Sequence, residues 1–212
     1  MGPWLIRCRH TLPLAAVALG LWLALSAGAA RAEGEGANTV GALYATLLDV
    51  MKNGQVLGPS GRYAQIAPVI PRLFDIPLMT RLAIGPDWEA LDEAQRQQVT
   101  QAFGRYIAAV YADRFDSYSG EKLRVIGEHA SNGGSVILSE IVKSNGDPVH
   151  INYLIRQSGG NWQIADVYLN GTISELATRR SEFASILRYQ GINGLIATLN
   201  GKAVSLGAAR AS

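Results

Sequence analysis

The spacing of apolar positions changes twice along the chain, and this predicts helices on either side of a sheet. Apolar residues first recur every three or four positions, which is typical of helices with one buried face. Four segments show this spacing: 40–51, 60–73, 75–84 and 92–115. Asp92 and Gln95 form a capping-box pattern at the start of the longest one. Asp75 is the expected cap of the third segment, and Gly85 follows its end.

The spacing then becomes two, which is the period of a strand. Four segments have this pattern: Leu123–Glu128, Ser135–Lys143, Val149–Arg156 and Trp162–Leu169. Glycine-containing turns separate them: Asn132-Gly133-Gly134, Asn145-Gly146-Asp147 and Ser158-Gly159-Gly160. Such short turns favour hairpins, so we expect an antiparallel meander. The last segment changes phase between Ile164 and Val167, which indicates a bulge or a strand covered on both faces.

Helical spacing returns after Ser174, is interrupted at Gly191 and ends at Gly201. This order of helices, antiparallel sheet and helices predicts an α+β fold. We expect four strands in a curved sheet with helices on its concave face. Such a cone would enclose an apolar interior.

The N-terminus has the order of features found in a secretory signal peptide. Arg7 and Arg9 precede an apolar run from Leu12 to Leu25, and Ala30-Arg31-Ala32 follows as a cleavage site. The run of about 14 residues is shorter than the roughly 20 that a membrane-spanning helix needs. A retained N-terminal anchor is the alternative. We therefore expect a cleavable signal peptide at 1–32, one domain at 33–203 and a flexible tail at 204–212.

Removal of this segment changes the composition of the working protein. Cys8 is the only cysteine, so the mature chain would have no disulfide, thiolate metal site or cysteine nucleophile. Lys and Arg fall from 19 to 16 while Asp and Glu remain 17, and the net charge changes from +2 to −1. This charge does not support nucleic-acid binding.

Candidate catalytic groups are few. His129 and His150 fall on different predicted strands, and two histidines without a thiol make a weak metal site. Asp166 is the remaining candidate, because a carboxylate among apolar neighbours can act as a general base. The alternative is that Asp166 accepts hydrogen bonds near a strand bulge or a helix end. We favour that second interpretation, and we expect no enzyme activity, no metal and no cofactor.

An ordered set of short motifs resembles the MlaC, or toluene-tolerance auxiliary, family of periplasmic lipid-binding proteins. The resemblance covers about Thr39 to Leu199. It rests on Phe74-Asp75-Ile76-Pro77, Met79, Arg81, Gly85, Trp88, Gln95-Arg96, Ala102-Phe103, Tyr111-Ala112, Trp162-Gln163-Ile164, Asp166-Val167, Gly171, Arg180, Phe183, Gly191, Leu195-Ile196 and Leu199. Thr172-Ile173-Ser174 and Thr178-Arg179 look closer to the hopanoid-associated HpnM branch.

The resemblance implies a fold related to nuclear transport factor 2 and an apolar cavity for a phospholipid or a hopanoid. It also implies transfer of that lipid between an inner-membrane ABC transporter and an outer-membrane complex, by a protein that we expect to be monomeric. A non-lipid adaptor without a cavity is a further alternative.

Candidate contacts follow from the sheet's expected inner face and the facing helices. For each single residue we favour ordinary core over contact with a ligand, because apolar stripes of helices are core by default. The lipid-binding candidates are Phe74, Ile76, Leu78, Met79, Leu82, Phe103, Ile107, Tyr111, Val136, Leu138, Ile151, Tyr153, Ile164, Ile173, Leu176, Phe183 and Leu187. Arg81, Arg179 and Arg180 are candidates for contact with a lipid headgroup or a protein partner.

Overall fold

The computed structural model describes residues 23–208. The chain divides into two units, Met1–Ala32 and Glu33–Ser212, and the second is described below. Most of the predicted signal peptide lies outside the described residues, so its cleavage stays a prediction. Among the helices that the structure describes, none combines the length and the apolar character needed to span a bilayer.

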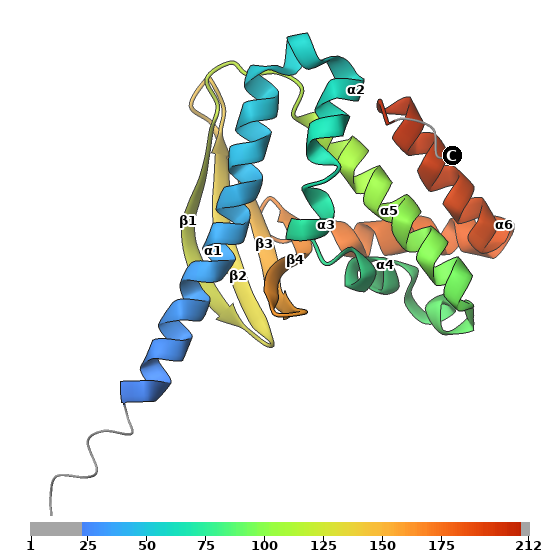
Figure 1. Cartoon of the computed structure of the whole chain (residues 1–212), viewed down its shortest axis with the longest axis horizontal. Helices are drawn as coiled ribbons and strands as arrows, with labels where there is room; N and C mark the ends of the chain where they lie inside the picture. The colour runs from blue at the N-terminus through green and yellow to red at the C-terminus, as the bar shows by residue number, and fades with distance from the viewer. Residues whose placement is uncertain (1–22, 209–212) are drawn as a thin grey trace, which may run out of the picture. The chain divides into compact units, whose positions relative to one another are not determined.

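The elements follow the predicted order and confirm an α+β fold with an antiparallel sheet (Figure 1). The helices are α1 (Leu23–Lys52), α2 (Gly54–Ile66), α3 (Ile70–Leu73), α4 (Ile76–Ile84), the 3-10 helix η1 (Gly85–Ala90), α5 (Glu93–Arg114) and α6 (Glu175–Ser205). The strands are β1 (Lys122–Ser131), β2 (Gly134–Val142), β3 (Pro148–Ser158), β4 (Asn161–Leu169) and β5 (Ile173–Ser174).

The sheet has five strands in the order β1-β2-β3-β4-β5, and the prediction of four was wrong. The additional strand β5 pairs Ile173 with Leu169 and Ser174 with Tyr168. Two residues are too few to show a period of two, so the sequence pattern of β5 cannot be told from the start of the next helix.

The predicted helix boundaries hold where a side chain or a glycine sets them. Asp92 and Gln95 form both hydrogen bonds of the capping box, and Ser174 accepts from the Ala177 N–H at the start of α6. Gly58 and Gly191 have positive φ values of 61° and 66° and interrupt α2 and α6.

The C-terminal boundary differs from the prediction. Helix α6 continues past Gly201 to Ser205, so the expected tail at 204–212 begins inside a helix. Ala208 is also buried, against Ala109 of α5 and Ala203 of α6. These small apolar contacts hold the end of α6 on α5. The remaining residues, 209–212, lie outside the described residues.

A bulge in β4 accounts for the change of phase in its sequence. Asp166 pairs with Leu154 and Ile164 pairs with Ile155, which leaves Ala165 without a partner on β3. Ile164 and Val167 are therefore both buried although their positions differ in parity. The predicted bulge is confirmed.

One face of the sheet is covered by helices, and this face holds the core. Helix α1 lies across the sheet, where Thr39 donates to the Trp162 carbonyl and Tyr44 contacts Tyr153 (Figure 1). The junction of α3 and α4 is tied to β4 by a hydrogen bond of 2.9 Å from the Asp75 N–H to the Ile164 carbonyl. Helices α5 and α6 pack against each other through Phe103 and Phe183.

Candidate functional site

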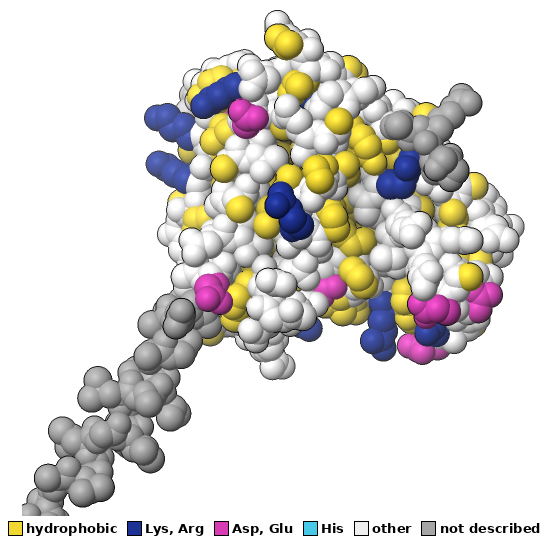
Figure 2. All heavy atoms as spheres, viewed as in Figure 1, with side chains coloured by type: hydrophobic (Ala, Val, Ile, Leu, Met, Phe, Trp, Pro, Cys, Tyr) yellow, Lys and Arg dark blue, Asp and Glu magenta, His cyan; other side chains and the backbone are white. Residues whose placement is uncertain are grey.

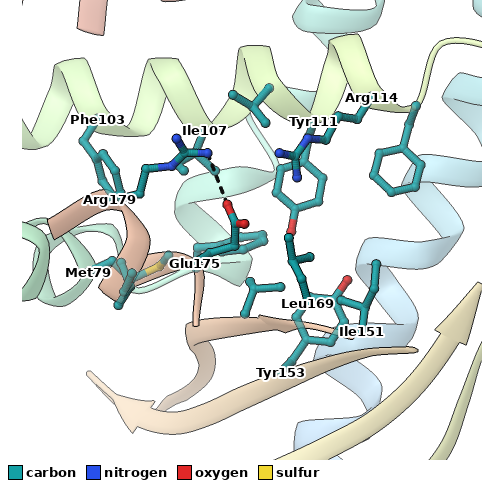
Figure 3. A pocket seen from close by; sticks show the side chains of 15 residues that line it. Met79, Phe103, Ile107, Tyr111, Arg114, Ile151, Tyr153, Leu169, Glu175 and Arg179 are labelled. Atoms are coloured by element: carbon teal, nitrogen blue, oxygen red, sulfur yellow. Dashed lines mark hydrogen bonds and ion pairs between the residues drawn. The ribbon is translucent and has the colours of Figure 1, made fainter. Parts of the chain in front are cut away.

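A cavity of about 120 Å³ lies between α5 and the covered face of the sheet (Figure 3). Its lining is mainly apolar and comes from α5, from β3 and β4, from the first turns of α6, from Phe74 just before α4 and from Met79 within α4. The lining residues are Phe74, Met79, Phe103, Ile107, Val110, Tyr111, Arg114, Phe115, Ile151, Tyr153, Val167, Leu169, Glu175, Leu176 and Arg179.

The local structure explains why these side chains converge. Phe103, Ile107 and Tyr111 are four residues apart and therefore lie on one face of α5. Ile151 and Tyr153 are two residues apart on β3 and point to the same side of the sheet. The bulge at Ala165 turns Val167 and Leu169 to this same side, opposite α5.

The charged groups at one side of the cavity are largely neutralised. Arg179 is paired with Glu175 at 3.2 Å and with Glu182 at 2.9 Å, and its side chain is only 12% exposed (Figure 3). Its guanidinium also lies over the ring of Tyr106. Arg179 therefore links α6 to α5, and its charge is already neutralised by two carboxylates.

Arg114 at the rim of the cavity was not among the predicted contacts. It is exposed, and Figure 3 shows it beside Tyr111. It forms no ion pair with any residue that the structure describes. Arg114 lies three residues after Tyr111 and seven after Ile107, so the helical spacing that identified those two residues also contains it.

Hydroxyl groups form the other polar feature of the cavity. Tyr111 and Tyr153 line it, and the ring of Tyr153 packs edge-on against that of Tyr44. Tyr44 in turn lies 2.5 Å from the Ser139 hydroxyl, which donates to the Ile151 carbonyl. Burial raises the pKa of Tyr111 and of Tyr153, so both phenols are neutral at physiological pH.

The structure brings together one subset of the predicted lipid contacts around the cavity: Phe74, Met79, Phe103, Ile107, Tyr111, Ile151, Tyr153 and Leu176. Three other candidates, Ile76, Ile164 and Phe183, are buried in the surrounding core. Leu78 and Leu187 are partly buried and do not line the cavity. Their contact with a lipid stays a prediction.

Four candidates were placed wrongly. Val136 and Leu138 lie on the opposite face of β2, because Ser135, Ile137 and Ser139 are the buried set. The apolar alternation of β2 indicated the wrong face because two of the three inward residues are serines.

Leu82 and Ile173 are also misplaced, being 45% and 53% exposed and outside the cavity. Leu82 falls on the outer side of α4, and Ile173 belongs to the short strand β5 at the sheet edge.

The remaining candidate residues lie away from the cavity. Arg81 is exposed and pairs with Glu89 at 3.5 Å, while Arg180 is exposed and lies over Gly85. His129 and His150 are exposed on β1 and β3. Within residues 23–208, no three His, Cys, Asp or Glu side chains come together as metal ligands.

Asp166 lies at the bulge of β4 and outside the cavity lining. Its carboxylate accepts hydrogen bonds from the Val167 N–H at 2.7 Å, the Ser174 hydroxyl at 2.6 Å and the Leu176 N–H at 3.2 Å. This is the structural role that we favoured over catalysis. It connects β4 to the start of α6.

A second, more open groove of about 520 Å³ runs between α2, α4 and α5. Its lining includes Tyr63, Ala67, Pro71, Ile76 and Ala108. Figure 2 shows apolar side chains gathered over this part of the surface. The groove shares no lining residue with the cavity.

The MlaC protein family model matches residues 42–201, a range that includes every residue that lines the cavity. The chain belongs to the MlaC family. The predicted resemblance is thereby confirmed at the level of the family, while assignment to the HpnM branch stays a prediction.

The fold is also that of a phospholipid-binding protein from Ralstonia solanacearum, solved in complex with a phospholipid. The TM-score is 0.67, the sequence identity is 22%, and the match covers 81% of this chain and 98% of that one. The likeness establishes a shared fold.

Replacement of Asp166 tests its role as the connection between β4 and α6. We expect Asp166→Ala to lower the free energy of unfolding by about 3 kcal/mol, because buried donors lose a charged acceptor. Asp166→Asn should lower the free energy of unfolding by a smaller amount, since its amide oxygen still accepts hydrogen bonds. Urea unfolding measures both, with exposed Asp87→Ala as the control. Equal midpoints for Asp166→Ala and Asp87→Ala would contradict this role.

Proposed function

We propose that this MlaC-family protein is a periplasmic lipid carrier that holds a membrane lipid with its apolar chains between α5 and the sheet. In this proposal it transfers the lipid between an inner-membrane ABC transporter and an outer-membrane complex. The observation that carries the proposal is the apolar cavity at this position in a chain of this family. Membership of the family points to a binding or transport protein rather than an enzyme.

Burial of apolar surface supplies the affinity. A chain of about sixteen carbons gains on the order of 12 kcal/mol when it leaves water, at roughly 0.8 kcal/mol per methylene. The cavity wall offers mostly side chains such as Phe103, Ile107 and Leu169, which suit a hydrocarbon chain. Few polar contacts are then needed, and this agrees with the small number of reactive groups in the mature chain.

The cavity must widen to accept such a chain. Its volume of about 120 Å³ is close to the ~150 Å³ of an engineered cavity that holds a single benzene molecule. Helix α5 packs mainly on α2, α4 and α6, while the sheet is held through α1, the α3–α4 junction and α6. We infer that lipid uptake separates α5 from β3 and β4.

The ligand in this proposal is a phospholipid, with a hopanoid as the alternative. Two of the residues that resemble the HpnM branch, Ile173 and Thr178, are exposed and lie outside the cavity lining. Only Arg179 among them reaches the cavity, and it is already paired with two carboxylates. In this proposal, the residues that line the cavity therefore determine which of the two lipids binds.

Arg114 is the cation best placed for a lipid phosphate. It lies at the rim, where a headgroup would emerge when the chains occupy the cavity. Its guanidinium has no carboxylate partner among the described residues, whereas Arg81 and Arg179 do. An unpaired guanidinium can form two parallel hydrogen bonds with a phosphate.

Solvent extraction of the purified mature protein, followed by mass spectrometry, tests the proposed function. We expect roughly one lipid per protein, because an apolar chain in water is far less stable than in the cavity. Protein stripped of lipid should accept it again from phospholipid vesicles. A protein that carries no lipid and takes none from vesicles would refute the proposal and favour the adaptor hypothesis.

Substitution of Arg114 tests the headgroup contact. We expect Arg114→Ala to bind a fluorescent phospholipid about tenfold more weakly, because a charge-assisted hydrogen bond contributes about 1.5–3 kcal/mol. Binding of a diacylglycerol with the same chains should not change. Arg180→Ala is the matched control, since Arg180 is exposed and lies outside the cavity. Equal losses of affinity in both variants, or for both lipids in Arg114→Ala, would rule out a phosphate contact at Arg114.

A further inference from the structure

Two acidic side chains share one arginine at the edge of the cavity. Arg179 donates through Nη2 to Glu175 at 3.2 Å and through Nη1 to Glu182 at 2.9 Å. Within residues 23–208, no other cation forms an ion pair with either carboxylate. One positive charge therefore faces two negative charges, and the cluster keeps one negative charge in excess.

The two carboxylates differ in where they lie. The side chain of Glu182 is 42% exposed and does not line the cavity, so water screens its charge. The side chain of Glu175 is 22% exposed and lines the cavity. Its Oε2 accepts from Arg179, while its Oε1 accepts from no residue that the structure describes. Glu175 therefore offers a charged acceptor to a ligand in the cavity.

Arg114 supplies the opposite charge at the same cavity. It belongs to the last turn of α5, and Figure 3 shows its guanidinium directed along α5 toward the side where Glu175 and Arg179 lie. Arg114 and Glu175 form no ion pair with each other, although both lie in the described part of the chain. A cation and an anion therefore face one cavity without neutralising each other directly.

We propose that the cavity selects phospholipids with a zwitterionic headgroup, in which the phosphate binds Arg114 and the ammonium group binds Glu175. This inference rests on the proposed lipid-carrier function and names the headgroup class. A phosphoethanolamine group carries both charges, joined by a linker of two carbons. Since Arg114 and Glu175 line one cavity of only about 120 Å³, a short headgroup can reach both.

An anionic headgroup fits these charges less well. Phosphoglycerol keeps the phosphate but has neutral hydroxyls in place of the ammonium group. A hydroxyl can donate to Glu175, but a hydrogen bond from a charged donor to a carboxylate is stronger. The four side chains, Arg114, Glu175, Arg179 and Glu182, are two cations and two anions, so no positive charge remains to compensate a headgroup with a net negative charge. Such electrostatic complementarity determines specificity.

Binding of three phospholipids with identical acyl chains to the mature protein tests the proposal. The probes are phosphatidylethanolamine, phosphatidylglycerol and phosphatidylethanolamine with an acetylated amine, which keeps the linker and loses the positive charge. Displacement of one fluorescent phospholipid at constant salt gives the relative affinities. We expect phosphatidylethanolamine to bind about tenfold tighter than either of the others, because both lack the charged donor.

Variants assign the selection to one carboxylate. Glu175→Gln keeps the size of the side chain and an acceptor for Arg179, and it removes the negative charge. It should bind the three lipids with similar affinity. Glu93→Gln is the matched control, because Glu93 lies in the first turn of α5 as Glu175 does in α6, and it is exposed outside the cavity lining. Glu93→Gln should keep the tenfold preference, and urea unfolding reports whether each variant is folded.

Equal affinity of the unmodified protein for phosphatidylethanolamine and for either of the other two lipids would overturn the proposal and leave the carrier function intact. A preference that persists in Glu175→Gln would also overturn it. The comparison of lipids on the unmodified protein decides the matter even if Glu175→Gln does not fold. Failure of all three lipids to bind would instead contradict the lipid-carrier function itself.

Discussion

The hydrogen bonds of the Asp166 carboxylate are the constraint on which the arrangement of the cavity depends. They hold the bulge of β4 to the first turn of α6 through Val167, Ser174 and Leu176. The bulge directs Val167 and Leu169 toward α5, and the anchored helix start places Glu175, Leu176 and Arg179 beside them. One buried acceptor therefore positions two sides of the cavity. This structural role accounts for the presence of a carboxylate among apolar neighbours.

The cavity combines an apolar wall with a small number of hydroxyl groups. The wall provides affinity in proportion to the hydrocarbon that it covers, and this effect does not distinguish one chain from another. Discrimination requires polar groups with a fixed orientation, because a misplaced donor or acceptor is costly in an apolar surrounding. Ser139 has such an orientation, since it donates to the Ile151 carbonyl, which can only accept, and is therefore left to accept from Tyr44.

Much of the fold was predictable from the sequence, and the errors have local causes. The helical stripe of Phe103, Ile107 and Tyr111 and the capping box of α5 follow from residue spacing, and both are present in the structure. The face of β2 was not predictable, because two of its inward residues are serines, one of which, Ser139, is the partner of Tyr44 and of the Ile151 carbonyl. Arg114 lay within the predicted stripe and was overlooked because the stripe was defined by apolar residues alone.

Photo-crosslinking with a phospholipid that carries a reactive group in the middle of one acyl chain tests the central claim most directly. After illumination and proteolysis, mass spectrometry identifies the labelled residues. The location of the chain between α5 and the sheet predicts adducts on cavity residues such as Ile107, Ile151 and Leu169. Adducts confined to the open groove of α2, α4 and α5, for example at Tyr63 and Ala67, would contradict it.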